Sequence, residues 1–323
     1  MKNRLNLILV ILVGLFVLVG CQSQYMRTAK LAVRDEDDPE KAIKNLKLEI
    51  EQNPENAEAY LLMSKVYGQY KKDYATAFEY ARKAVEVDSS VKPEAEAIYT
   101  TSWAQLHNQG LDEFEAEDYE ASLKYFKKAN NIFPDSLVTE KMLANTYIRL
   151  DSMDRAKDVY VNIIEDYPDD VKSRESLATI YYNNGKYEEA IKYYKDLVEL
   201  EPNKINWPYN IAVCYSTMGE HNKALTYYKE ALSYEPENKK LLHKIAATEF
   251  NNENYEYSAN YYSKILEMDS EDGEALEFIT RSYNFLKDWD NVLKYATKWK
   301  EVKPDSETAR LFVNLAKQKL SSQ

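Results

Sequence analysis

Proline recurs at intervals of 34 residues along most of the chain, and this period constrains the fold more than any other feature of the sequence. The prolines stand at positions 134, 168, 202, 236 and 304, with a serine at 270. Small and aromatic residues recur in the same register, at Gly110, Ala144, Ala178, Ala212 and Ala246, and at Phe126, Tyr160, Tyr194, Tyr228 and Tyr262. A period of this length is typical of solenoids, in which each unit buries its apolar face against its neighbours.

The segment Val171–Lys204 shows how one unit folds. Apolar residues of its first half share one helical face, and those of its second half share another. They are Leu177, Ala178 and Tyr181 in the first half, and Ala190, Ile191, Tyr194 and Leu197 in the second. Gly185 ends the first helix, and Pro202 ends the second because proline lacks a backbone N–H. The sequence therefore predicts two helices that pack closely through small residues.

This pattern resembles the tetratricopeptide repeat (TPR), whose marker positions are occupied here by Leu177, Ala178, Tyr181, Ala190, Tyr194 and Pro202. The resemblance implies an all-α fold, a right-handed α-solenoid of about seven or eight helix-turn-helix repeats. The array is expected over residues 39–306, with repeats at 57–91, 92–136, 137–170, 171–204, 205–238, 239–272 and 273–306. Residues 307–323 are expected to form a capping helix and tail. We interpret the whole as one continuous array.

Three departures from the regular period lie toward the N-terminus. Residues 21–38 fit either a degenerate first helix or a tether. The repeat at 57–91 has one extra residue, which we expect in the turn near Lys71–Asp73. The additional residues 92–102 are expected to lengthen a first helix to residues 94–116, about 35 Å.

The first 20 residues combine the positive charges of Lys2 and Arg4 with a long apolar run, as in a secretory signal. The stretch from Leu18 to Cys21 resembles the lipobox of bacterial lipoproteins. This resemblance implies that residues 1–20 are removed as a signal peptide and that Cys21 carries the lipid. Gln22 follows the cysteine, which resembles the sorting pattern for the outer membrane. We expect a lipid-anchored envelope protein on the periplasmic face of the outer membrane, or on the outer face of the membrane in a single-membrane organism.

Several kinds of chemistry are disfavoured by the composition. The formal net charge of −12 argues against a nucleic-acid partner, because such a partner requires a cationic face. The three histidines, His107, His221 and His243, are not spaced as metal ligands. Cys214 is expected to be a buried structural thiol. We therefore predict a protein that is not an enzyme and has no metal and no cofactor.

The resemblance also implies a concave groove lined by residues of the first helices. The candidate partner-binding residues are Tyr182, Tyr209, Asn210, Lys240, His243, Lys244 and Phe250. Asn210, Lys240 and Lys244 match part of the carboxylate clamp of TPR co-chaperones. Glu175 and Thr179, however, stand where that clamp has lysine and asparagine. We therefore expect a small cationic spot beside Tyr209 and Phe250 rather than a complete clamp.

The function indicated is a lipid-anchored scaffold that binds a peptide or partner protein in the groove. Such a scaffold would help assemble an envelope complex: outer-membrane protein, pilus or secretion machinery. The alternative is a glycan-binding uptake lipoprotein built on TPRs. It is disfavoured because residues 103–306 contain no insertion that could build a sugar site. The 28 tyrosines are mostly expected at core positions of the repeats rather than in a glycan site.

Overall fold

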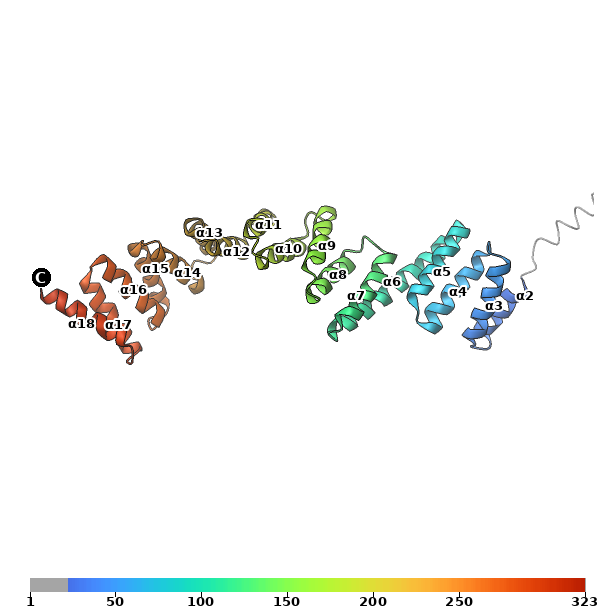
Figure 1. Ribbon diagram of the computed structural model, residues 1–323, viewed down its shortest axis with the longest axis horizontal. Coiled ribbons are helices and arrows are strands. Elements are labelled where there is room, and N and C mark those ends of the chain that lie inside the picture. The colour runs from blue at the N-terminus through green and yellow to red at the C-terminus, as the bar shows by residue number, and fades with distance from the viewer. Residues whose placement is uncertain (1–22, 323) are drawn as a thin grey trace, which may run out of the picture. The chain divides into compact units, whose positions relative to one another are not determined.

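The computed structural model describes residues 23–322, and every element in that range is a helix (Figure 1). The predicted fold class, an all-α solenoid of helix-turn-helix repeats, is confirmed. The expected signal peptide at residues 1–20 and the lipid site at Cys21 lie outside the described residues. Among the described residues, no helix combines the length and the apolar character needed to cross a membrane.

The described residues divide into two compact units, residues 23–159 (unit 1) and residues 160–322 (unit 2). The helices of unit 1 are α2 (Gln24–Arg34), α3 (Pro39–Gln52), α4 (Ala57–Val66), α5 (Tyr74–Val87), α6 (Lys92–Glu115), α7 (Tyr119–Ile132) and α8 (Leu137–Arg149), with the short turns η1 (Tyr67–Lys71) and η2 (Ser89–Val91). The division falls within α9 (Met153–Asp166).

Unit 2 continues the same succession of short helices. Its helices are α10 (Val171–Asn183), α11 (Tyr187–Leu200), α12 (Asn206–Thr217), α13 (His221–Tyr234), α14 (Lys239–Asn251), α15 (Tyr255–Met268), α16 (Gly273–Leu286), α17 (Trp289–Val302) and α18 (Glu307–Ser321). Within each unit a helix packs mainly against the helices that precede and follow it. The small residues predicted at the helix crossing are in place, because Ala178 of α10 and Ala190 of α11 are fully buried in one core cluster.

The turn inside each helix pair contains one residue with a left-handed backbone. These residues are Asp37, Lys72, Glu117, Asp151, Gly185, Gly219, Glu253 and Lys287. From Glu117 onward they are spaced 34 apart, like the prolines. From Glu117 onward, the residue after each one donates its N–H to a carbonyl five residues earlier, as Lys186 does to Tyr181 at 2.9 Å, and this hydrogen bond closes a Schellman motif. After Asp37 and Lys72 the accepting carbonyl lies six residues earlier.

Residues 24–34, which the sequence left open between a helix and a tether, form helix α2. This helix buries Met26, Ala29 and Ala32 in one cluster with apolar residues of α3 and α4. Its N-cap residue Ser23 donates a hydrogen bond to Glu49, a glutamate of α3 that is only 1% exposed. The segment is therefore part of the packed structure of unit 1.

Two local irregularities occur where the sequence predicted them. The π-helical turn η1 accommodates the extra residue of the repeat 57–91. The C-cap residue of this turn, Lys72, has a left-handed backbone. Helix α6 contains 24 residues and is therefore about 36 Å long. The predicted range for this helix was 94–116, and the observed one is Lys92–Glu115.

Pairs of stacked tyrosines join the two helices of several repeats at one register. The pairs are Tyr67–Tyr80, Tyr181–Tyr193, Tyr215–Tyr227 and Tyr283–Tyr295, with ring centroids 5.5–5.6 Å apart and ring planes within 18° of parallel. A second set of tyrosines is buried at 34-residue spacing, at Tyr160, Tyr194, Tyr228 and Tyr262. Much of the high tyrosine content therefore serves packing between helices.

Candidate functional site

The seven candidate binding residues all lie on the first helices of three successive repeats in unit 2. Tyr182 belongs to α10, Tyr209 and Asn210 belong to α12, and Lys240, His243, Lys244 and Phe250 belong to α14. We call the surface that carries them the first-helix face. Five of them belong to three groups, a cationic spot, a polar cluster and an aromatic cluster, whereas Asn210 is adjacent to Tyr209 in the sequence and Tyr182 is separate.

The cationic spot consists of Tyr209, Lys240 and Lys244. The Nζ atom of Lys240 lies 5.6 Å from the ring centroid of Tyr209, which is a cation–π contact between α14 and α12. Lys244 is exposed and follows Lys240 by four residues, so the two ammonium groups share one face of α14. Asn210 is half-buried on α12, next to Tyr209 in the sequence.

A small cavity of about 240 Å³ opens at this spot. Its lining residues are Ile205, Asn206, Tyr209, Glu235, Asn238, Lys240 and Leu241. The carboxylate of Glu235 accepts a hydrogen bond from the Asn238 amide at 2.7 Å. Neither Lys240 nor Lys244 forms an ion pair within the described part of the chain, so both charges are available to a carboxylate from another molecule.

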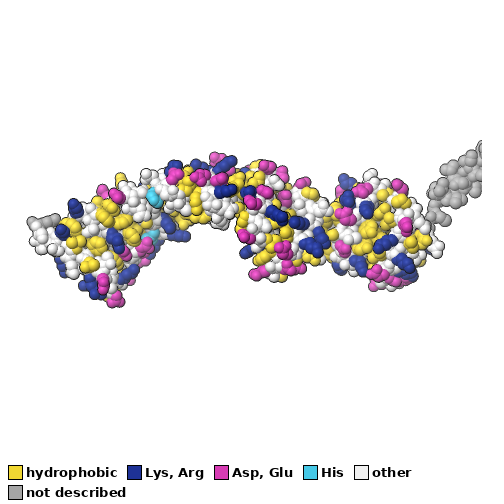
Figure 2. All heavy atoms as spheres, viewed as in Figure 1, with side chains coloured by type: hydrophobic (Ala, Val, Ile, Leu, Met, Phe, Trp, Pro, Cys, Tyr) yellow, Lys and Arg dark blue, Asp and Glu magenta, His cyan; other side chains and the backbone are white. Residues whose placement is uncertain are grey.

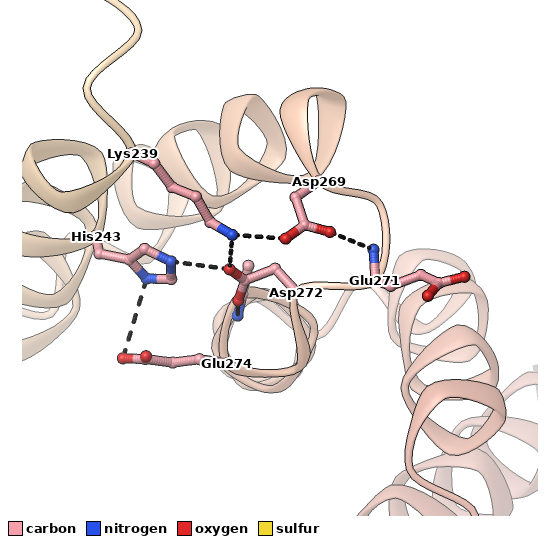
Figure 3. Close-up of polar contacts among 7 residues, drawn as sticks. Lys239, His243, Asp269, Glu271, Asp272 and Glu274 are labelled. Carbon is pink, nitrogen blue, oxygen red and sulfur yellow. Dashed lines mark hydrogen bonds and ion pairs between the residues drawn. The ribbon is translucent and has the colours of Figure 1, made fainter.

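The polar cluster forms where the start of α14 meets the start of α16 (Figure 3). Asp272 is its centre: Lys239 Nζ lies 2.7 Å and His243 Nε2 lies 3.2 Å from the carboxylate oxygen Oδ2. Lys239 also contacts Asp269 at 2.6 Å. The same Asp272 caps α16, because its side chain accepts the N–H of Ala275 at 2.9 Å.

The surroundings of Asp272 determine its protonation. Burial alone would raise the pKa of this carboxyl group, but hydrogen bonds from Lys239, from the Ala275 N–H and from His243 together lower the pKa to about 2. The His243 ring also packs edge-on against Tyr262, at 5.9 Å between centroids. The His243 side chain therefore links α14 to the start of α16 through Asp272 and is not free on the first-helix face.

The aromatic cluster surrounds Phe250 near the end of α14. Its ring lies 5.3 Å from Tyr255, 5.4 Å from Phe278 and 5.8 Å from Phe285, each in an edge-on arrangement. Tyr255 and Phe285 stack at 4.3 Å. Phe285 remains 54% exposed, so the cluster presents an apolar surface to solvent.

The sequence suggested that Phe250 lies beside the cationic spot, but the ring contacts of Phe250 are with an aromatic cluster. Lys240 and Phe250 are ten positions apart on one helix, which corresponds to about 15 Å. Phe250 instead contacts residues of α15 and α16. Tyr182 is likewise separate, because its ring packs edge-on against Tyr187 of α11 at 5.5 Å.

Sequence reasoning missed several members of these clusters. Phe278 and Phe285 occupy groove positions of the repeat 273–306: Phe278 follows Lys244 by 34 residues and Phe285 follows Asn251 by 34. Extending the groove positions by one more repeat would have found both. Lys239 and Asp272 carried no such signal, because their interaction depends on how two neighbouring repeats meet.

Comparison with known protein families agrees with the helix-turn-helix repeats seen in the structure. Three family models, each described as tetratricopeptide repeat, match residues 57–90, 142–170 and 173–234. The chain contains tetratricopeptide repeats over these residues. No curated protein matches it.

The solved structures that match part of the chain include a TPR protein and MamA proteins. YrrB, "a TPR protein with an unusual peptide-binding site", is 22% identical, covering 62% of this chain and 96% of its own, with a TM-score of 0.38. MamA from Desulfovibrio magneticus RS-1 is 14% identical, covering 53% and 96%, with a TM-score of 0.46. Another MamA structure is 17% identical, covering 50% and 95%, with a TM-score of 0.44.

Within residues 23–322, no group of three or more His, Cys, Asp or Glu side chains is placed to hold a metal ion. Cys214 of α12 is fully buried in a hydrophobic core cluster, and burial raises the pKa of its thiol to about 11. His107 is also buried, which lowers its pKa, and its Nδ1 lies 3.2 Å from the hydroxyl of Thr139.

Proposed function

We propose that this protein is a binding scaffold that holds an extended segment of a partner protein along the first-helix face of unit 2. One observation carries the proposal: two lysines without ion pairs in the described structure lie on the same helix as Phe250, whose aromatic cluster includes the exposed Phe285 of α16. Lys240 and Lys244 suit a carboxylate of the partner. Phe250 and Phe285 suit an apolar side chain.

The distance between the two contact points defines the partner segment. Lys240 and Phe250 are about 15 Å apart along α14. An extended peptide advances about 3.3 Å per residue. A segment that runs along α14 therefore places its acidic group and its apolar side chain about four or five residues apart. A short acidic–apolar motif of this spacing is the ligand we propose.

We further propose that the scaffold is lipid-anchored to a bacterial envelope membrane and helps assemble an envelope complex. The support for this part is the sequence alone: the basic start, the apolar run and the Leu-Val-Gly-Cys stretch that ends at Cys21. A Cys21→Ala protein is expected to remain unprocessed or become soluble. Normal membrane retention of a cleaved Cys21→Ala product would contradict the anchor.

The binding proposal is tested by crosslinking in the native organism, followed by mass spectrometry of the captured proteins. Lys240→Glu/Lys244→Glu is expected to lose a specific partner, and Phe285→Ala to weaken its capture. The matched control is Lys192→Glu/Lys195→Glu, which reverses two exposed lysines on the second helix α11. Circular dichroism verifies that each variant is folded.

Two outcomes would refute this binding site. One is capture of the same proteins in the same amounts by the Lys240/Lys244 variant and the wild type. The other is calorimetric binding of oligosaccharides that the Lys240/Lys244 and Phe285 variants abolish while protein capture persists. That second result would instead support the glycan-binding alternative.

A further inference from the structure

A cleft in unit 1 lies between the second helices α5 and α7, away from the residues that the proposed function uses. It has a volume of about 550 Å³. Phe78 of α5 and Ile132 of α7 form part of its wall and are both largely buried, at 7% exposure. Lys83, Lys127 and Lys128 also line it.

A second cavity of about 430 Å³ shares a side with the first. Lys127 and Lys128 line both cavities, and the second one adds Lys124 and Leu123. Two adjoining hollows on unit 1 are therefore flanked by four lysines of α5 and α7. We call this surface the lysine cleft. Figure 2 shows dark blue side chains gathered over the part of unit 1 where Figure 1 places α7 and its neighbours.

Helix α6 packs against both of the helices that line the cleft. The additional turns of this helix pack against α5, where Ala95 joins Ala81 and Ala84 in one cluster. The later turns of α6 pack against α7, where Leu106 meets Ala129. Phe78 of α5 belongs to the same cluster as Leu106 of α6 and Ile132 of α7, so the two apolar wall residues of the cleft are held in one core with α6.

The charges of the cleft are not neutralised by the chain itself. None of the four lysines forms an ion pair with any described residue, although the chain as a whole carries a net charge of −12. Lys83, Lys127 and Lys128 instead lie over tyrosine rings, each at 5.8 Å. Of the two glutamates that line the cavities, Glu79 is paired with Arg82 at 2.8 Å, and Glu120 is exposed. The surface is therefore a cationic one in an acidic protein.

We propose that the lysine cleft binds an acidic segment of a partner protein, in which carboxylates flank one apolar side chain. The lysines supply the charge complementarity, and the recess beside Phe78 and Ile132 accepts the apolar side chain. A flat lipid surface would contact the lysines but would leave the recess unfilled, which favours a protruding peptide over a membrane. The site lies in a different unit from the first-helix face and is independent of the function proposed above.

Fluorescence anisotropy with a labelled synthetic peptide, glutamates on both sides of a central tryptophan, tests the proposal on the full chain in detergent. We expect the peptide to bind and the affinity to fall as salt is added. Lys127→Glu/Lys128→Glu should weaken binding by about tenfold or more, since like charges then face the peptide. The control Lys192→Glu/Lys195→Glu carries the same charge change on α11, with Lys195 at the repeat position of Lys127, and should bind like the wild type.

Three results would overturn the assignment. The peptide could bind the Lys127/Lys128 variant as well as the wild type. A second peptide with glutamines in place of the glutamates could bind equally, which would remove the role of charge. Mixed micelles containing phosphatidylglycerol could bind in a Lys127/Lys128-dependent way while the acidic peptide does not, which would assign the cleft to a membrane surface. Equal melting temperatures of the variants and the wild type establish that folding is unchanged.

Discussion

A Cβ atom on Gly110 would lie 2.7 Å from Cε1 of Phe126, so the contact between α6 and α7 depends on the missing side chain at position 110. The Phe126 ring is completely buried. The hydroxyl of Ser122 donates to the Gly110 carbonyl at 2.9 Å and fixes the same crossing. Close approach of the Phe126 ring to the backbone of α6 is therefore the reason for a glycine within this helix.

Gly110→Ala is expected to destabilise unit 1 by about 1–3 kcal/mol, because the added methyl group displaces a buried ring. Alanine's higher helix propensity, worth about 1 kcal/mol, offsets only part of this. Thermal unfolding followed by circular dichroism measures the effect. Gly68→Ala is the control, since a Cβ there would meet Ala77 at an ordinary 3.6 Å. A Gly110→Ala protein as stable as the wild type would contradict the close contact between Gly110 of α6 and Phe126 of α7.

Glu253→Gly is expected to stabilise the protein by about 0.5–1 kcal/mol. Glu253 has a φ of 62°, where a residue with a Cβ is strained and glycine is not. Gly219 occupies the equivalent turn with a φ of 77° and has open space around it, so Gly219→Ala should lower stability through the backbone alone. Chemical unfolding of both variants tests the pair; changes of the opposite sign would exclude strain in these turns.

Asp272 is expected to make stability depend on pH in the acid range. Its pKa is about 2 in the folded chain and near 3.8 when unfolded. Between these values the unfolded state binds the proton first, so the free energy of unfolding falls as the pH drops from about 4 to about 2. Above pH 4 the contribution of Asp272 is complete.

Two variants separate the charge of Asp272 from its capping role. Asp272→Asn retains a good N-cap and should lose stability less steeply than the wild type on acidification. Asp272→Ala removes the cap as well and should cost about 1–2 kcal/mol more at neutral pH. Unfolding curves at several pH values provide the comparison. Parallel pH profiles for the wild type and Asp272→Asn would show that the Lys239–Asp272 contact contributes nothing.

Cys214 is expected to react very slowly with thiol reagents in the folded protein. It is fully buried, and its raised pKa of about 11 leaves almost no thiolate at neutral pH. A Cys21→Ser protein contains Cys214 as its one thiol, so a colour assay with a disulfide reagent reports on it directly. Rapid labelling without denaturant would contradict this burial; complete labelling in denaturant is the control.

The regular part of the fold could be predicted from the sequence because it depends on local chemistry repeated in one register. Pro202 and Gly185 end helices by their own backbone properties, and Ala178 and Ala190 mark a crossing that tolerates no larger side chain. The turns at Glu117, Glu253 and Lys287 use the same left-handed backbone without glycine, so composition gave no sign of them.

The candidate site could be predicted only in part. The repeat register correctly assigned Tyr209 and Lys240 to facing first helices, where they form a contact. It could not reveal that His243 is engaged by Asp272, since that bond joins residues 29 positions apart across two repeats. The role of Phe250 as a binding residue stays a prediction.

The neighbour-to-neighbour packing within each unit has a mechanical consequence. Tension along a unit passes through its helix pairs in series, because helices that are distant in sequence make few direct contacts. The least stable helix pair therefore unfolds first, and its unfolding relieves the tension on the other pairs. Each pair that opens releases about 110 Å of extended chain for its 34 residues. A protein built in this way can lengthen in discrete steps under load and shorten again when the load is removed.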